Sequence, residues 1–387
     1  MNLSTPQSGT TFQSSADPIT VVGHIGICRE HLRGPFDLFF RLFLTILGSD
    51  NSYSPSCRSL ERVSKSALPL DLPLLEEDLH RVEEELRASV VTEDPFLTEV
   101  ARNLIVAGGK RLRPVLSLAS AYAGSGTAHH DTVRGAVAVE LVHLGSLYHD
   151  DVMDEATTRR GTPTANARFG NFIAIVAGDF CLAVSAQIAA ALGVEVSGLL
   201  GYTIGELCKG QVAEFQTLFK LDRSEEAYFR SIDGKTASLM AAASRVGAIT
   251  SGLPSTQVEA LTVFGQRVGM VFQIADDILD VVATDEQLGK PAGNDLVEGV
   301  YTLPVLRALR DRHIGEELAR LLGSPVDRSA VDQLRKLVRS SDGIEQAIGV
   351  ARTFANEARA SLDAMPASAV RTDMANLGHA LLDRLVV

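Results

Sequence analysis

Several residue types are scarce in this chain, and each scarcity argues against a class of protein. Tryptophan is absent, aromatic residues make up only 5%, and the formal charge is −12 over 387 residues. An acidic balance without a basic stripe argues against nucleic acid as a partner and against binding to an anionic membrane surface. Any anionic ligand must therefore be held by local cations or by a metal ion.

Cysteine and sheet-forming patterns are scarce too. The four thiols, Cys28, Cys57, Cys181 and Cys208, show neither a CxxC pair nor another metal-ligand spacing. We therefore predict reduced thiols in a cytoplasmic protein. The chain lacks a Walker loop, GxxxxGK[ST], and has no alternation of apolar and polar residues long enough for a sheet.

Only two apolar runs raise the question of a membrane. Pro35–Gly48 is interrupted by Asp37 and Arg41 and is too short to span a bilayer. Asn171–Leu192 is long enough, but Asp179 lies near its centre and no Lys or Arg cluster flanks it. We predict a buried core helix there and no transmembrane segment.

The first part of the chain differs from the rest. Residues 1–70 are rich in Ser, Thr, Pro and Gly and lack sustained periodicity. We expect a disordered or poorly ordered extension there, or upstream sequence translated from a mis-assigned start. Residues 71–387 carry the regular pattern and are predicted to form one folded domain.

Helical periodicity dominates this domain. Leu75, Leu79, Val82 and Leu86 recur on one helical face with glutamates opposite, which is typical of an amphipathic helix. Apolar stretches between short Gly, Pro, Asp or Asn breaks predict further helices at 95–107, 112–124, 131–154, 166–192, 194–219, 224–251, 255–284, 300–322 and 328–365. We predict an all-α fold, a single bundle of ten or more helices, several of them buried at its centre.

Two acidic clusters lie inside predicted apolar helices: Asp150, Asp151 and Asp154 in LYHDDVMDEA, and Asp276, Asp277 and Asp280 in FQIADDILD. In each cluster the first and last aspartate lie about one turn apart on the same face. Like charges on an apolar helix are destabilising unless they are compensated. A single cluster would be typical of a solvated face, but two sets of hard oxygen ligands favour a Mg²⁺ site.

Basic residues and a threonine accompany the clusters: Lys110, Arg111 and Arg113 in GGKRLRP, Arg159 and Arg160 after the first cluster, and Lys235, Thr236 and Lys290 around the second. The two glycines of GGKRLRP free backbone amides that can help to seat a diphosphate. Together these groups predict two bound anions. One would be bridged to carboxylates by metal, and the other held directly by cations.

At these motifs the chain resembles the trans-type polyprenyl diphosphate synthases of the polyprenyl synthetase family. GGKRLRP, HDDVMDEATTRRG, GKTASL, FQIADDILD and GKPAGNDL stand in the family's order, and LYHDDVMDEA is especially similar to actinobacterial long-chain members. The resemblance covers about residues 72–387 and implies that 71–387 form a catalytic domain around a deep central cavity. It also implies a cytoplasmic homodimer that uses about two or three Mg²⁺ ions per site to condense isopentenyl diphosphate with an allylic prenyl diphosphate.

The resemblance assigns roles to individual residues. Metal binding falls on Asp150, Asp154 and Asp276, supported by Asp151, Asp277 and Asp280. Contact with the allylic diphosphate falls on Arg159, Lys235, Thr236, Gln273 and Lys290. Contact with isopentenyl diphosphate falls on Lys110, Arg113, His143 and Arg160. Catalysis is expected to depend most on the six aspartates, Arg159 and Lys235.

The expected chemistry is an ionisation. Metal and cations stabilise the leaving diphosphate, and the double bond of isopentenyl diphosphate attacks the resulting carbocation. Proton loss then restores an alkene, with the released diphosphate as the expected base. An apolar cavity keeps water away from the cation.

Product length is predicted from the two residues one turn before Asp150, Gly145 and Ser146. Short-product members of the family generally place aromatic rings there. Small residues therefore predict an open tunnel and a long product, roughly C30–C50, as used for the tail of a quinone such as menaquinone and passed to a membrane.

Other functions fit fewer of these motifs. A di-iron bundle would use Glu77-x-x-His80 and Glu140-x-x-His143, but it leaves the aspartate clusters and the basic residues unexplained. A class I terpene cyclase shares the first aspartate motif, but its second metal motif normally has an Asn/Ser/Glu form. A shorter-chain synthase stays open. So does a catalytically silent subunit of a heteromeric synthase, although such subunits typically lose acidic residues that are intact here.

Overall fold

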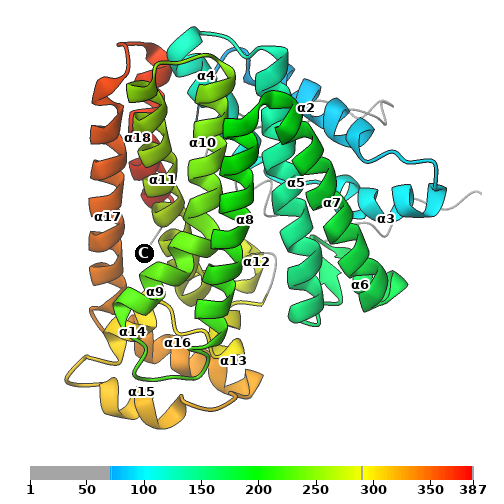
Figure 1. The fold of residues 1–387 in the computed structure, drawn as a ribbon. Coiled ribbons are helices and arrows are strands. Elements are labelled where there is room, and N and C mark those ends of the chain that lie inside the picture. Colours follow the sequence, from blue (N-terminus) through cyan, green and yellow to red (C-terminus); the bar gives the residue numbers. More distant parts are fainter. Residues whose placement is uncertain (1–69, 71, 289–290, 386–387) are drawn as a thin grey trace, which may run out of the picture. The chain divides into compact units, whose positions relative to one another are not determined.

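The computed structural model describes residues 70, 72–288 and 291–385, all of them within the unit Asp50–Val387 (Figure 1). Apart from Leu70, the extension predicted over residues 1–70 lies outside the described residues and stays a prediction. The apolar stretch Pro35–Gly48 and the first two cysteines lie there too. The two described cysteines, Cys181 and Cys208, are both free thiols.

Helices form most of the described structure, which confirms the all-α prediction. In chain order the elements are α2 (Leu75–Ser89), α3 (Pro95–Val106), α4 (Leu112–Ser125), α5 (His130–Met153), β1 (Thr158–Arg159), β2 (Thr162–Pro163), α6 (Ala165–Phe169), α7 (Asn171–Leu192), α8 (Val194–Phe215), α9 (Glu225–Ile232), the π-helical turn η1 (Asp233–Ala237), α10 (Ser238–Thr250), α11 (Ser255–Val282), α12 (Asp285–Leu288), α13 (Asn294–Glu298), α14 (Leu303–Ala308), α15 (Gly315–Leu321), η2 (Arg328–Ala330), α16 (Val331–Arg339), α17 (Gly343–Ser361), η3 (Leu362–Ala364) and α18 (Ala369–Leu382). Among the described residues, β1 and β2 form a single antiparallel hairpin.

Several predicted helices are broken where local chemistry interrupts them. The stretch 166–192 divides at Gly170, whose φ of 86° is accessible to glycine but disfavoured for other residues. The stretch 224–251 contains the π-helical turn η1 between α9 and α10. The stretch 300–322 turns at Asp311, whose side chain accepts hydrogen bonds from the backbone N–H groups of His313 and Ile314. Periodicity alone does not reveal these breaks, because the apolar pattern continues across them.

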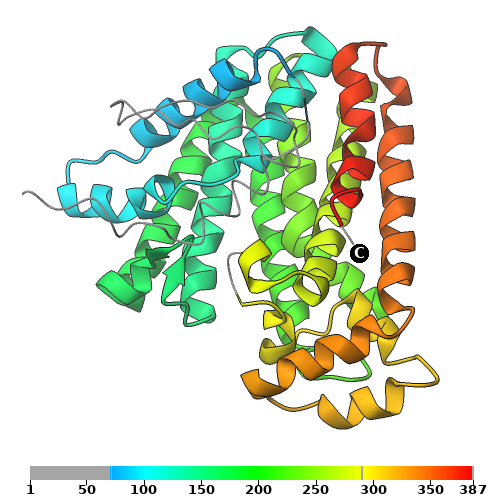
Figure 2. The same ribbon diagram turned by 180° about the vertical axis from the view of Figure 1, so that it is seen from behind.

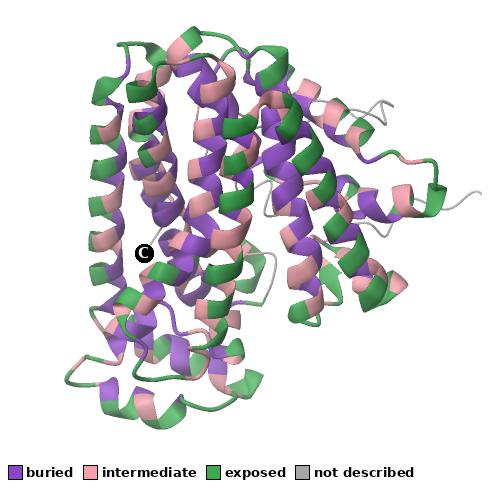
Figure 3. Ribbon diagram, in the orientation of Figure 1, coloured by how far each residue is buried: buried purple, intermediate pink, exposed green. Residues whose placement is uncertain are grey.

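The long helices lie side by side in one bundle. Two opposite views show α5, α7, α8, α10, α11 and α17 running along a common direction, with α13 to α16 across one end (Figures 1 and 2). α5 packs mainly on α7, and α10 packs on α4 and α11. α5 and α10 are mostly buried, whereas α7 and α8 turn exposed faces outward (Figure 3). The aspartate-bearing helix α5 therefore lies inside the bundle.

Glycines allow two close crossings that position the site. A Cβ at Gly178 of α7 would lie 3.0 Å from the carbonyl oxygen of Gly145 in α5. A Cβ at Gly234 of η1 would lie 2.8 Å from the Cα of Gly210 in α8. Side chains at these positions would push the helices apart. The second crossing places η1, with Lys235 and Thr236, against α8.

α7 differs from the prediction of a buried core helix. It is the one described helix long and apolar enough to cross a membrane, and 44% of its most apolar window is buried. Its other face, with Phe172, Ile175 and Val176, is exposed. The buried face of α7 packs on α5, so only part of this apolar helix belongs to the core.

Candidate active site

The hairpin β1–β2 separates the two arginines that follow the first aspartate cluster. Its turn residues, Arg160 and Gly161, have φ angles of 53° and 73°, as a type I′ hairpin turn requires. Arg159 donates from Nε to Oδ1 of Asp151 at 2.5 Å. The guanidinium of Arg160 instead packs on Gly109, where a Cβ would lie 2.6 Å from its Nη1. A left-handed arginine is strained, and the two consecutive cations lie against different neighbours.

The first aspartate cluster lies at the end of α5. Asp151 is 1% exposed and holds Arg159, while Asp150 is half-buried and Asp154 is exposed at the helix terminus. Burial raises the pKa of Asp150, with Lys235 opposing the shift and Asp154 adding to it, and burial also raises the pKa of Asp154. The pKa of both carboxyl groups stays raised although Lys235 and Arg159 oppose the shift, so a further cation would stabilise their charged forms.

Arg111, in the loop GGKRLRP, forms ion pairs that attach this loop to α2 and α5. It has a left-handed φ of 47° at the start of α4 and is buried. Its Nη1 donates to Glu140 of α5 at 2.9 Å, and its other nitrogens reach Glu83 of α2. Glu140 is thus an ion-pair partner of Arg111, and Glu77 is exposed, so the two Glu-x-x-His pairs do not come together as a di-iron site would require.

Arg113, Arg160 and His143 lie near one another beside Arg111, and each is half-buried. Burial, opposed by Glu140 and reinforced by Arg160, lowers the pKa of Arg113 to about 10. Burial and the nearby arginines also lower the pKa of His143 well below its usual value, so the imidazole is neutral at pH 7. Arg113 Nε and Arg160 Nη1 are buried without a hydrogen-bond partner among the described residues. Buried donor atoms of this kind, without a partner in the protein, are suited to bind an anionic ligand.

Lys235 connects the two halves of the site. Its Nζ lies 2.6 Å from Oε1 of Glu214 in α8. Burial alone would lower the pKa of Lys235, but Glu214, Asp150 and Asp154 outweigh burial and raise it. The ammonium therefore stays charged between the first aspartate cluster and α8.

The second aspartate cluster, on α11, is held by a chain of hydrogen bonds. Thr236 donates to Oε1 of Gln273 at 2.7 Å, and Nε2 of Gln273 donates to Oδ1 of Asp277 at 2.8 Å. Tyr228 donates to the other oxygen, Oδ2, at 2.5 Å. Burial, with Asp276 adding to it, raises the pKa of Asp277 to about 7. Asp280 is also buried and accepts from the backbone N–H groups of Asn294 and Asp295.

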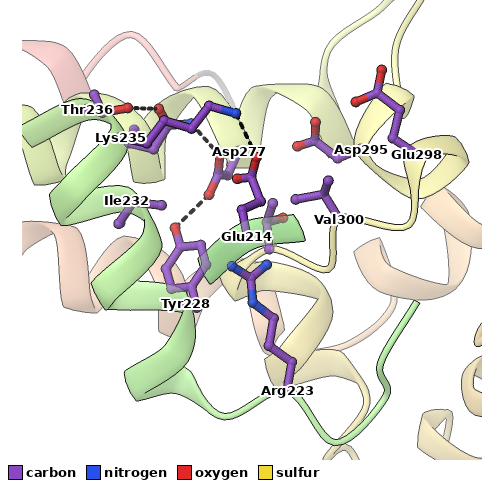
Figure 4. Close-up of a pocket in the computed structure, with 12 residues that line it drawn as sticks. Glu214, Arg223, Tyr228, Ile232, Lys235, Thr236, Asp277, Asp295, Glu298 and Val300 are labelled. Carbon is purple, nitrogen blue, oxygen red and sulfur yellow. Dashed lines mark hydrogen bonds and ion pairs between the residues drawn. The ribbon is translucent and has the colours of Figure 1, made fainter. Parts of the chain in front are cut away.

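A small cavity of about 120 Å³ adjoins this chain (Figure 4). Figure 4 shows Tyr228, Asp277, Glu214 and Arg223 converging on it from α9, α11, α8 and the segment before α9. The twelve lining residues are Glu214, Arg223, Tyr228, Ile232, Lys235, Thr236, Gln273, Asp277, Asp295, Glu298, Val300 and Thr302. Charged side chains thus line the cavity from segments that precede η1 in the sequence and from segments that follow it.

The structure sorts the six aspartates into two groups. Among the described residues, none donates a hydrogen bond or ion pair to the carboxylates of Asp150, Asp154 or Asp276, whereas Asp151, Asp277 and Asp280 each accept at least one. Within the part of the chain described, no three His, Cys, Asp or Glu side chains are close enough to hold a metal ion by themselves. Lys290 lies outside the described residues, and Lys110 is exposed.

The two chain-length residues occupy different environments. Gly145 is buried at the crossing with α7, where a Cβ would lie 3.0 Å from Leu182 Cγ, so the open space predicted beside it is filled by α7. Ser146 is half-buried on the same side of α5 as Asp150, and its hydroxyl donates to the carbonyl oxygen of His143 at 2.9 Å. The prediction of an open tunnel therefore rests on Ser146 alone.

Comparison with known proteins identifies the family. The sequence model of the family described as polyprenyl synthetase matches residues 94–340. The chain belongs to the polyprenyl synthetase family. The enzyme is 42% identical to nonaprenyl diphosphate synthase of Mycobacterium tuberculosis, over 74% of this chain and 86% of that one. It is 40% identical to heptaprenyl diphosphate synthase component 2 of Geobacillus stearothermophilus, over 77% and 92% of the two chains.

Solved structures give the same fold. Geranylgeranyl pyrophosphate synthase from Corynebacterium glutamicum, complexed with calcium and isoprenyl diphosphate, superposes with a TM-score of 0.72 at 37% identity, over 80% of this chain and 96% of that one. The family and the all-α isoprenoid synthase fold implied by the motifs are therefore confirmed, and the chain is a prenyltransferase enzyme. Glu214 and Tyr228 were not predicted from the sequence, because their partners lie on other helices.

Proposed function

We propose that the enzyme condenses isopentenyl diphosphate repeatedly, head to tail, with an allylic prenyl diphosphate and makes a long trans-polyprenyl diphosphate. The observation that carries this proposal is the division of the aspartates. Asp150, Asp154 and Asp276 keep their oxygens free of described partners, and buried neighbours restrain Asp151, Asp277 and Asp280. Carboxylates held in this way suit Mg²⁺, which accepts one or two carboxylates and takes waters or phosphate oxygens at its other positions.

Asp150, Asp154 and Asp276 would hold about two or three Mg²⁺ ions together with the allylic diphosphate. The metal would neutralise charge on the diphosphate and make it a better leaving group. Arg159, Lys235, Thr236, Gln273 and Lys290 would bind the same diphosphate. Lys110, Arg113, His143 and Arg160 would bind isopentenyl diphosphate. The orphaned donors on Arg113 and Arg160 support the second seat.

The reaction follows from these positions. The allylic C–O bond breaks and both electrons leave with the diphosphate, beside Arg159 and Lys235. The double bond of isopentenyl diphosphate supplies the electron pair of the new C–C bond. A proton is then lost to the released diphosphate, which restores an alkene. Buried apolar residues of α5 and α10 exclude water that would capture the cation.

A long product, roughly C30–C50, is supported by Ser146 and by the relatives. The relatives named nonaprenyl and heptaprenyl synthases are 42% and 40% identical to the chain. Such a product would supply a quinone tail and be passed from the cytoplasm to a membrane. Incubation with Mg²⁺, isopentenyl diphosphate and farnesyl or geranylgeranyl diphosphate, followed by product sizing, tests the proposal. A product of C20 or shorter would contradict the long-chain part, and no turnover with any allylic primer would favour a silent subunit.

We also propose a homodimer, supported by the exposed face of α8. Val194, Gly198, Gly201, Gly205, Cys208, Val212 and Phe215 recur at alternating spacings of four and three residues, as in a helix that packs against another helix. A Cβ at Gly198, Gly201 or Gly205 would meet nothing within 4 Å. α7 also exposes Phe172, Ile175 and Val176.

The dimer is tested by Gly201→Arg, which adds bulk to open space in the single chain but would obstruct a second copy. Gly349→Arg on α17, where a Cβ also meets nothing within 4 Å, is the matched control. We expect sedimentation to show a dimer for wild type and for Gly349→Arg, and a monomer for Gly201→Arg. A wild-type monomer at micromolar concentration would contradict the homodimer and favour a heteromeric assembly.

A further inference from the structure

One buried tyrosine outside the two motifs touches the second aspartate cluster. Tyr228, on α9, is 1% exposed, and its hydroxyl donates to Oδ2 of Asp277 at 2.5 Å. The tyrosine has little freedom to move. The Arg223 guanidinium lies 5.5 Å from its ring centre, and the ring of Phe229 packs edge-on at 5.3 Å between centroids. Arg223 in turn donates to Ser231 Oγ at 2.6 Å and to the carbonyl oxygen of Tyr301 at 3.0 Å.

Through this contact Tyr228 determines which way Asp277 faces. One carboxylate oxygen accepts from Tyr228 and the other from Gln273. Both oxygens are therefore engaged by the protein, with one donor on each, and these two hydrogen bonds restrain the carboxylate. Asp277 then orients the amide of Gln273, because Nε2 donates to Asp277 while Oε1 accepts from Thr236. Figure 4 shows how Tyr228, Asp277 and Thr236 come together from α9, α11 and η1.

We infer that Tyr228 is a positioning residue for the allylic diphosphate, acting through Asp277 to fix the amide of Gln273 and the hydroxyl of Thr236. The inference rests on the proposed function, in which those two residues bind the allylic substrate. Tyr228 is expected to affect the binding of the allylic diphosphate and not that of isopentenyl diphosphate. No described hydrogen bond links the chain Tyr228–Asp277–Gln273–Thr236 to His143 or Arg113, which are proposed to bind isopentenyl diphosphate.

Tyr228→Phe removes one hydroxyl and leaves the ring in place. A buried carboxylate then loses one of its two donors, and an unsatisfied buried group is free to rotate toward another partner. We expect the KM for the allylic diphosphate to rise about tenfold, equivalent to about 1.4 kcal/mol, with the KM for isopentenyl diphosphate unchanged within about twofold. The dissociation constant of an unreactive thio-analogue of farnesyl diphosphate, measured calorimetrically with Mg²⁺, should rise by the same factor.

The chain supplies a matched control. Tyr122 donates to Oδ2 of Asp78 at 2.6 Å, in a buried pair of the same chemistry between α4 and α2. Tyr122→Phe should lower the melting temperature as much as Tyr228→Phe does and leave both KM values unchanged. An equal change in allylic KM from both variants would show a general loss of packing and overturn the inference.

A double-mutant cycle with Asp277→Asn completes the test. If Tyr228 acts through the carboxylate, its replacement by Phe should change analogue binding by less than about twofold when Asp277→Asn is already present. The inference is overturned if Tyr228→Phe weakens analogue binding just as much when Asp277→Asn is present. It is also overturned if Tyr228→Phe alone binds the analogue as tightly as the wild type. In both cases, turnover by the wild type would still support the proposed function. Absence of turnover by the wild type would count against the proposed function instead.

Discussion

The two aspartate clusters have the same spacing but different surroundings. Asp150 and Asp276 hold the first position, and neither has a described hydrogen-bond donor; Asp151 and Asp277 hold the second, and both are buried and hydrogen-bonded. The third position differs. Asp154 is exposed at the end of α5, whereas Asp280 lies inside α11 and accepts from two backbone amides in the first turn of α13. Spacing places three carboxylates near one face, and tertiary neighbours decide which of them have described hydrogen-bond partners.

The residues one turn deeper also differ. Gly145 and Ser146 precede Asp150, but Val271 and Phe272 precede Asp276 at the same distances. The residues one turn before the first aspartate are therefore small on α5 and large on α11. The predicted room for a growing chain therefore lies on the α5 side, at Ser146.

The largest effect is expected at the first position of both clusters. Asp150→Ala and Asp276→Ala should each lower kcat by about 10²–10³-fold or more, because a group that stabilises the leaving diphosphate is lost. Steady-state kinetics measures the loss, and circular dichroism should show an unchanged helical fold. Full activity in either variant would remove that aspartate from the metal site and break the equivalence of the two clusters.

The third positions should respond in opposite ways. Asp280→Asn replaces one of the two acceptor oxygens with a donor NH2 group. One of the two backbone N–H groups then has no acceptor, and the free energy of unfolding should fall by about 1–3 kcal/mol. Asp154→Asn should change stability by less than about 0.5 kcal/mol and instead raise the Mg²⁺ concentration needed for half-maximal activity. Denaturant titration and a Mg²⁺ titration of activity separate the two. Equal losses of stability in the two variants would mean that the exposed and the buried aspartate contribute equally to folding, which would contradict this prediction.

Ser146→Phe gives α5 the side chain that Phe272 already supplies at the equivalent position of α11. The ring should block the tunnel one turn below Asp150 and shorten the product by several isoprene units without a large fall in total turnover. Product sizing by chromatography checks this. Gly145→Ala serves as contrast, because its Cβ would press on α7 and reduce stability rather than select a length. An unchanged product from Ser146→Phe would place the tunnel elsewhere.

The smallest effect concerns the position seven residues before each cluster, which is His143 on α5 and Gly269 on α11. Burial, then Arg113 and Arg160, lower the pKa of His143 well below 6.5. As the pH falls below about 6.5, the unfolded chain takes up this proton before the folded chain does, so the stability is present above that pH and lost below it. His143→Gln should therefore show a smaller fall in melting temperature than wild type between about pH 7 and pH 5. An identical fall would mean that other groups carry the pH dependence.

Sequence patterns predicted the parts of this molecule that depend on local periodicity. The face formed by Leu75, Leu79, Val82 and Leu86 is buried as predicted, and both aspartate clusters lie on long helices. Contacts between distant segments were not predictable. Tyr228 and Asp277 are 49 residues apart, and Lys235 and Glu214 are 21 apart. Since neither partner stands at a helical spacing from the other, only the folded bundle shows that they meet.

The space predicted beside Gly145 shows the same limit. A small residue indicates room on its own helix, but it does not say whether another helix uses that room. Here α7 approaches so closely that Leu182 and the Gly178 carbonyl occupy it. The sites assigned through the family motifs remain predictions until the variants above are measured.

The left-handed turn at Arg160 would link the two substrates thermodynamically under the proposed function. Arg159 and Arg160 are consecutive, so their Cα atoms are about 3.8 Å apart, yet Arg159 pairs with Asp151 and Arg160 packs on Gly109. If each serves a different diphosphate, a ligand that orders one arginine also orders the hairpin that carries the other. The second ligand then binds a turn whose conformational entropy has already been lost. Binding of the two diphosphates would be mutually favourable and reciprocal, each tightening the other by the same factor.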